Sequence, residues 1–170
     1  MSRPDWRDAC HYNWTMTNRR TLPALVLVLA ATAFAAAAPE PVVWPAPKDV
    51  PERVRAAGLK MLDSEAMDMH IHTTLKVYSG GRPVTVPADI GIDRSGPKPR
   101  YSPLHTHDTT GTLHVESERW RDFTLGQFMT EWGVSGVRER CGAAVGGHPR
   151  SGDPSRIVLR DGETITLRCR

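Results

Sequence analysis

Residues 68–78 read DMHIHTTLKVY, and the alternation of side chains along this stretch decides the fold that the sequence predicts. Apolar residues and one threonine occupy the odd positions from 69 to 77, whereas polar residues occupy the even positions from 68 to 76. Because successive side chains of a strand point to opposite faces, this period of two predicts a strand with one buried face. The turn signal SGGR at 79–82 predicts that residues 83–86 return as the second arm of a hairpin.

Further along the chain, a second alternating stretch predicts another strand. Residues 112–117 place Leu113 and Val115 on one face and His114 and Glu116 on the other. Before it, residues 93–103 have the composition of a loop and residues 104–107 are expected to be short and extended.

A helix is predicted over residues 125–132. Its apolar positions are spaced i, i+3, i+4 and i+7, which gives one apolar stripe that is most simply explained as core. Thr124 is expected to cap the start of the helix, and Gly133 is suited to end it.

The C-terminal part completes the predicted fold. Residues 135–155 are expected to form a glycine-rich loop, and residues 157–159 and 164–167 flank a D-G turn that is typical of a hairpin. The sequence therefore predicts a small α+β domain, with a mixed or antiparallel sheet of about five strands and one helix on one face. A β-grasp-like arrangement is one candidate.

The N-terminal part has the composition of a leader. Residues 21–38 form an uncharged apolar run directly after Arg19 and Arg20, with an A-x-A pattern at 33–35. These are the parts of a secretory signal peptide, and the run is also just long enough for a membrane anchor. Residues 1–15 are unusual for such a leader, so we expect translation to begin at Met16. The arginine pair matches a twin-arginine signal only in part.

The expected organisation follows from this leader. We assign residues 1–38 to a signal peptide or N-terminal anchor, 39–66 to a proline-rich linker with a short helix at 52–64, and 67–170 to a histidine-rich α+β domain. The protein is thus expected to be extracytoplasmic, either secreted or anchored to the cytoplasmic membrane. Its net charge of +3, from 22 basic and 19 acidic residues, is too weak and too mixed to indicate nucleic-acid binding.

The cysteines are consistent with an oxidising compartment. Cys10 lies in the leader, which leaves Cys141 and Cys169 as a pair. We predict a disulfide between them, because a thiolate metal site needs closer spacing or more cysteines.

Histidines are concentrated in one part of the sequence. Five of the seven lie between residues 70 and 114, in two His-x-His pairs and at position 114. Side chains at i and i+2 of a strand share a face, so His70 and His72 share one, as do His105 and His107 if that segment is extended. His70, His72 and His114 lie opposite the apolar positions, so the imidazoles are expected to converge on the polar face of the sheet.

Clustered imidazoles favour a transition-metal site. Imidazole binds Zn, Cu, Ni and Fe, and the absence of a suitable cysteine favours Cu(II) or Zn over a blue-copper centre. Nearby acids are expected to ligate the ion or orient a ring. The predicted metal ligands are His70, His72, His105, His107, His114, Asp108 and Glu116, and Asp68 is a further nearby acid. Two alternatives stay open: structural surface histidines, and a metal-free acid/base site.

Four segments together resemble a group of uncharacterised bacterial exported proteins. These segments read HIHTTLKVYSGGRPVTVPADIGI, SPLHTHDTTGTLHVES, DFTLGQFMTEWGV and DPSRIVLRDGETITL. Members of the group carry an H-x-H strand, an L-H-T-H-D-x-x-G-x-x-H-V-E block and an F-x-L-G-x-F-x-x-W-G helix. The resemblance covers residues 68–170 and implies a shared domain with these histidines and acids as its signature, but it implies no activity.

The sequence thus favours an exported domain that binds copper or zinc in metal handling or sensing, with no assigned catalytic residue and a non-enzymatic role preferred. Two alternatives remain: a metal-dependent enzyme with Asp108 or Glu116 as general base, and a metal-free interaction module of the cell envelope.

Overall fold

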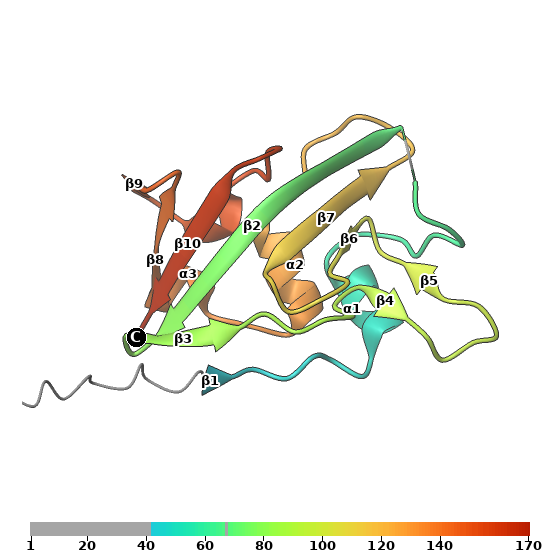
Figure 1. Ribbon diagram of the computed structural model, residues 1–170, viewed down its shortest axis with the longest axis horizontal. Helices are drawn as coiled ribbons and strands as arrows, with labels where there is room; N and C mark the ends of the chain where they lie inside the picture. The colour runs from blue at the N-terminus through green and yellow to red at the C-terminus, as the bar shows by residue number, and fades with distance from the viewer. Residues whose placement is uncertain (1–41, 67) are drawn as a thin grey trace, which may run out of the picture. The chain divides into compact units, whose positions relative to one another are not determined.

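The computed structural model describes residues 42–66 and 68–170, and a long strand, β2, organises them (Figure 1). The elements are β1 (Val42–Val43), α1 (Val50–Ala56), β2 (Met69–Ser79), β3 (Arg82–Thr85), β4 (Ile92–Asp93), β5 (Arg100–Tyr101), β6 (Leu104–His105), β7 (Thr112–Ser117), α2 (Leu125–Trp132), α3 (Val137–Arg140), β8 (Cys141–Val145), β9 (His148–Arg150), the 3-10 helix η1 (Pro154–Arg156) and β10 (Thr164–Cys169).

The predicted leader lies outside the described residues, as does the proposed start at Met16. Among the residues that are described, no helix is both long enough and apolar enough to cross a bilayer.

Both edges of β2 are paired. One edge pairs with antiparallel β7 over residues 69–74 and with antiparallel β3 over residues 77–79, and the other pairs with parallel β10 over residues 74–79. The sheet continues from β10 to β8 and β9, and from β3 to β1, while β6 pairs with β7. This eight-stranded mixed sheet confirms the α+β class but has more strands than the predicted five, and its strand order does not confirm a β-grasp. β4 and β5 form a separate two-stranded sheet.

The alternation along β2 is confirmed. Residues 69, 71, 73, 75 and 77 are buried, whereas residues 70, 72 and 76 are exposed. The buried face joins a single hydrophobic core with α2, which lies behind the sheet in Figure 1. The other face of the N-terminal half of β2 is therefore free to carry polar side chains.

The predicted helix is also confirmed, together with both of its ends. The Thr124 hydroxyl accepts a hydrogen bond from the Gln127 backbone N–H (3.4 Å), and the Gln127 side-chain oxygen accepts one from the Thr124 N–H (3.0 Å). This reciprocal capping box fixes the start of α2. Gly133 ends the helix with φ of 84°, a left-handed conformation that glycine adopts without steric cost.

Two predictions for the C-terminal part are wrong. Residues 157–159 do not form a hairpin with β10, because Leu125 N–H donates to the Ile157 carbonyl and Leu159 N–H donates to the Phe123 carbonyl. This segment is therefore held beside the chain that leads into α2. The expected loop at 135–155 instead contains α3, β8, β9 and η1, since β10 supplies β8 with an antiparallel partner.

Residues 42–66 differ from the expected free linker. Val50, Val54 and Leu59 are buried in the core, and Trp132 Nε1 donates to the Trp44 carbonyl (3.3 Å). The helix expected at 52–64 is shorter and begins earlier, at Val50–Ala56. A proline is tolerated in its first turn, because the N–H groups there have no partner within the helix.

The sulfur atoms of Cys141 and Cys169 lie at disulfide distance, as the sequence predicted. The two residues are register partners on the antiparallel strands β8 and β10. Pairing within one sheet therefore brings together two cysteines that are 28 positions apart in the sequence.

Candidate metal centre

A row of three histidines crosses three neighbouring strands. In the strand registers, His72 of β2 lies opposite His114 of β7, and His114 lies opposite His105 of β6. Directly paired residues of antiparallel strands point to the same face, so the registers bring the three rings together. The alternation of side chains predicts the strands β2 and β7, whereas the register between them is known only from the folded sheet.

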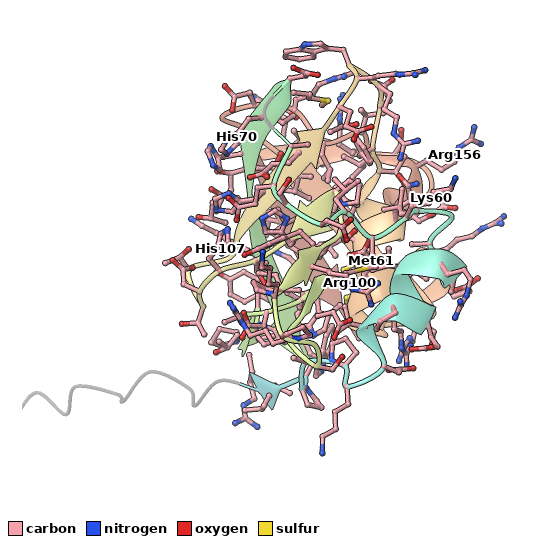
Figure 2. The ribbon with its side chains drawn as sticks, turned by 90° about the vertical axis from the view of Figure 1, so that its right-hand side faces the viewer. Lys60, Met61, His70, Arg100, His107 and Arg156 are labelled. Carbon is pink, nitrogen blue, oxygen red and sulfur yellow. A yellow bond between two sulfur atoms is a disulfide. The ribbon has the colours of Figure 1, made fainter. Side chains whose placement is uncertain are left out.

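A second row lies beside the first. His70 is the register partner of Glu116, and both are two residues from a member of the first row. His107 follows His105 by two residues and lies just beyond β6. Figure 2 shows His70 and His107 on the same side of the molecule, away from α1.

The ring nitrogens of these histidines approach one another closely. His72 Nε2 lies 3.1 Å from His70 Nε2 and 3.2 Å from His114 Nδ1. On the other side, His105 Nε2 lies 3.2 Å from His107 Nε2. These separations suit hydrogen bonds between neutral rings, and they are also close to the roughly 3.3 Å expected between two nitrogen ligands of a tetrahedral zinc ion.

Glu116 lies close to three of the rings but has no hydrogen bond of ordinary geometry to them. Its side chain is 1% exposed, and its Oε1 lies 3.3 Å from His70 Nε2, 3.6 Å from His114 Nδ1 and 3.8 Å from His105 Nε2. Neither carboxylate oxygen has a hydrogen bond of ordinary geometry to any described residue. Burial raises the pKa of Glu116, and the nearby Glu65 carboxylate raises it further, whereas the His70 and His107 rings and the Ala66 backbone N–H lower it in part. A buried carboxylate in this state is destabilising unless a cation or another donor compensates it.

His105 is oriented by the chain before β6. Its Nδ1 lies 2.9 Å from the Ser102 carbonyl oxygen, which can only accept a hydrogen bond. Nδ1 therefore carries the proton, and the lone pair of Nε2 points toward His107 and the two carboxylates. Ser102 is held in turn, because its hydroxyl donates to Glu131 Oε1 (2.6 Å).

The buried rings favour their neutral form. Burial lowers the pKa of His105 to about 4, against the opposing effect of its hydrogen bond to the Ser102 carbonyl. Burial also lowers the pKa of His114 to about 4, and repulsion from His107 and His72 adds to this effect. Both rings are thus unprotonated at neutral pH, the state that a metal ion requires.

Glu65 lies beside the histidines, although the sequence pattern does not predict it there. Its Oε1 lies 3.1 Å from His107 Nε2 and 3.8 Å from His105 Nε2. It belongs to the segment that was expected to be a linker, where no periodic pattern distinguishes one acid from another. Proximity in sequence to the first His-x-His pair was the only available signal.

The predicted ligand Asp108 lies outside the converging groups. Its carboxylate accepts hydrogen bonds from the Thr110 N–H (2.8 Å) and hydroxyl (2.6 Å), and the side-chain bond is the main reason why its pKa is lowered. Asp68 and the exposed His148 are likewise absent from the ligand groups found among the described residues. Asp108 therefore shapes the turn before β7, and Glu65 takes the place expected for it.

Seven side chains thus form three overlapping groups, each with donor atoms within 4.8 Å of one another. The groups are His70, His72 and His114; His105, His107 and His114; and Glu65, His105 and Glu116. This imidazole and carboxylate set suits Zn²⁺ or Cu²⁺. His70 also lines a neighbouring pocket of about 580 Å³ together with Trp120, Arg121 and Arg160.

No protein-family model matches the chain, no curated protein is significantly similar to it in sequence, and no solved structure matches its fold. The function must therefore be inferred from the geometry of the site.

Proposed function

We propose that this protein is an extracytoplasmic domain that binds a transition metal, copper or zinc, in metal handling or sensing. The ligands are drawn from His70, His72, His105, His107 and His114, together with Glu65 and Glu116. The observation that carries the proposal is the buried, unpartnered Glu116 carboxylate, which faces ring nitrogens from three strands. A divalent cation beside Glu116 would supply the missing partner of this carboxylate and would bind the nearest ring nitrogens.

The alternative of structural histidines explains less of the arrangement. Neutral rings could satisfy one another through hydrogen bonds at the observed distances of 3.1–3.2 Å. Such a network leaves both oxygens of Glu116 without a partner among the described residues, at a cost of about 1–3 kcal/mol or more. Metal binding removes this cost, which is why we favour it.

An extracytoplasmic location is supported by two features. The Cys141–Cys169 pair at disulfide distance suits an oxidising compartment. The apolar run at 21–38 has the parts of an export signal or anchor.

Metal analysis tests the proposal directly. We expect the chelator-stripped chain to bind Zn²⁺ and Cu²⁺ tightly by calorimetry, and to retain them through desalting. The His105→Ala/His107→Ala variant should lose at least tenfold in affinity, since it removes two of the five rings. His148→Ala is the matched control, because His148 is exposed on β9 and distant from the ligand groups in the register.

Two results would contradict the proposal. One is the absence of metal binding by the folded wild-type chain, and the other is an equal loss of affinity in His148→Ala. In either case the metal-free interaction module becomes the better interpretation.

A metal-dependent enzyme is the second candidate, and the pocket beside His70 favours it. The pocket combines the exposed Trp120 ring with Arg121 and with Arg160, which is paired with Asp122 (2.7 Å), so it offers a surface of mixed charge for a substrate next to a bound ion. An enzyme would show turnover with the loaded protein that exceeds that of the free ion. A protein of metal handling or sensing would instead exchange its ion without turnover.

A further inference from the structure

We propose that the site holds two metal ions that share Glu116, an inference that rests on the proposed metal binding. The first observation is the number of donors. Seven side chains belong to the three ligand groups, whereas a zinc ion is held by about four ligands. One ion would leave several donors packed together without a role.

Half-site A is formed by His70, His72 and His114. His72 Nε2 is 3.1 Å from His70 Nε2 and 3.2 Å from His114 Nδ1. Two ligands at about 2.0–2.1 Å from one ion are separated by at most about 4.2 Å, so these contacts fit a single ion. The strands β2 and β7 supply all three rings, and their pairing holds the half-site rigidly.

Half-site B is formed by His105, His107 and Glu65. His107 Nε2 lies 3.2 Å from His105 Nε2 and 3.1 Å from Glu65 Oε1, and His105 Nε2 lies 3.8 Å from the same oxygen. All three distances again fit one ion. This half-site draws on β6, on His107 just beyond it and on the segment before β2. His114 of half-site A also lies within 4.8 Å of the donor atoms of His105 and His107, so it stands at the border between the two half-sites.

Glu116 lies on the border between the half-sites. Its Oε1 is 3.3 Å from His70 and 3.6 Å from His114 in half-site A, and 3.8 Å from His105 in half-site B. Its Oε2 is also buried and has no hydrogen-bond partner among the described residues. The same oxygen, Oε1, faces both half-sites, so the negative charge of one carboxylate lies between two ions about 3.5–4 Å apart and reduces their repulsion. One shared carboxylate explains why this acid is buried between the two sets of rings.

The stoichiometry of metal binding tests the inference. We expect the chelator-stripped full chain to bind two Zn²⁺ per molecule, measured by calorimetric titration and by elemental analysis after desalting. His72→Ala and His107→Ala should each retain one ion, since each removes an exposed ring from one half-site. His148→Ala should retain two. Glu116→Gln should weaken the second ion by at least tenfold, and circular dichroism should show that every variant is folded.

Paramagnetic resonance with Cu²⁺ supplies a test that needs no variant. The second equivalent of Cu²⁺ should produce a spin-coupled signal, because two ions that share a carboxylate lie within a few ångströms of each other. Uncoupled signals at two equivalents would overturn the shared site.

The possible results distinguish a failure of the two-ion site from a failure of the proposed metal binding. One Zn²⁺ per wild-type chain would overturn the two-ion site and leave the proposed metal binding intact. No binding at all would overturn both. Two ions in His72→Ala or in His107→Ala would place an ion elsewhere and would also overturn the inference.

Discussion

Glu131 shows how a single buried residue behind the site influences the whole molecule. Its side chain is 1% exposed, and its Oε1 accepts a hydrogen bond from Ser102, the residue that orients His105. Burial raises the pKa of Glu131 to about 8, against the opposing hydrogen bond. The carboxyl is therefore mostly protonated at neutral pH, and it supports the site from the core side as a neutral group.

Replacement of Glu131 by glutamine should flatten the pH dependence of stability. The folded pKa of about 8 exceeds the ordinary value of 4.5, so between these values the folded state binds more protons than the unfolded state. Glu131 thus contributes stability below pH 4.5 that is lost as the pH rises toward 8, with a slope of about 1.4 kcal/mol per pH unit from this group alone. We expect Glu131→Gln to be more stable than the wild type at pH 9 and nearly equal to it at pH 4.5.

Urea denaturation at several pH values measures this effect. Glu118→Gln is the matched control, because it makes the same substitution at an exposed glutamate. A parallel profile for Glu131→Gln and the wild type would show that Glu131 does not titrate in this range.

At the level of residues, the sequence predicts which face of the sheet carries the histidines better than it predicts which residues lie together there. The positions of His70, His72 and His114 opposite apolar neighbours place them on the polar face, since a strand has a strict period of two. Glu65 could not be predicted, because it approaches His107 only through the folded path of an irregular segment. Asp108 was predicted from proximity in sequence, but local hydrogen bonds to Thr110 hold it in a turn.

At the level of elements, local patterns predict β2, β7 and α2, whereas partners that are distant in sequence are not readable. The capping box and the terminal glycine of α2 lie within a few residues of each other, so the sequence contains the complete signal. The strand β8 reads CGAAV, which has the composition of a loop, and it is a strand because β10 pairs with it. The parallel pairing of β10 with β2 joins segments about 90 residues apart and overrides the D-G hairpin signal.

Helix α2 depends on close contact with η1 at Gly126. A Cβ built on this residue would lie 2.8 Å from the Ser155 carbonyl oxygen and 2.9 Å from the Ser155 Cβ. In an open helix, Gly→Ala stabilises by up to about 1 kcal/mol, but here the backbone of Ser155 would have to move. We expect Gly126→Ala to lower the free energy of unfolding by roughly 1–3 kcal/mol, measured by urea denaturation.

The matched control for this helix contact is Gly142→Ala. Gly142 lies in β8, and no described atom other than its own neighbours lies within 4 Å of its built Cβ. A loss of less than about 0.5 kcal/mol is expected there. Similar losses at both positions would mean that the contact between α2 and η1 does not limit stability.

At the level of the whole molecule, β2 separates the candidate metal centre from the cysteine pair. His70 and His72 lie in the half of β2 that pairs with β7. Cys169 is the register partner of Ser79, at the opposite end of the same strand. The histidine cluster therefore lies at one end of β2 and the cysteine pair at the other, so a mutation in one should leave the other unchanged.

Removal of the disulfide should destabilise the fold and leave metal binding unchanged. A bond that closes a loop of 28 residues contributes roughly 3–4 kcal/mol in the chain-entropy model. We expect Cys141→Ser/Cys169→Ser to lose a similar amount in urea denaturation, with an affinity for Zn²⁺ within about twofold of the wild type under conditions where it is folded. Alkylation and mass spectrometry of the wild type should find Cys141 and Cys169 blocked, and reduction should reproduce the loss seen in the variant. Two free thiols in the exported protein would contradict the pairing, whereas a parallel loss of affinity in the folded variant would contradict the independence of the two ends of the sheet.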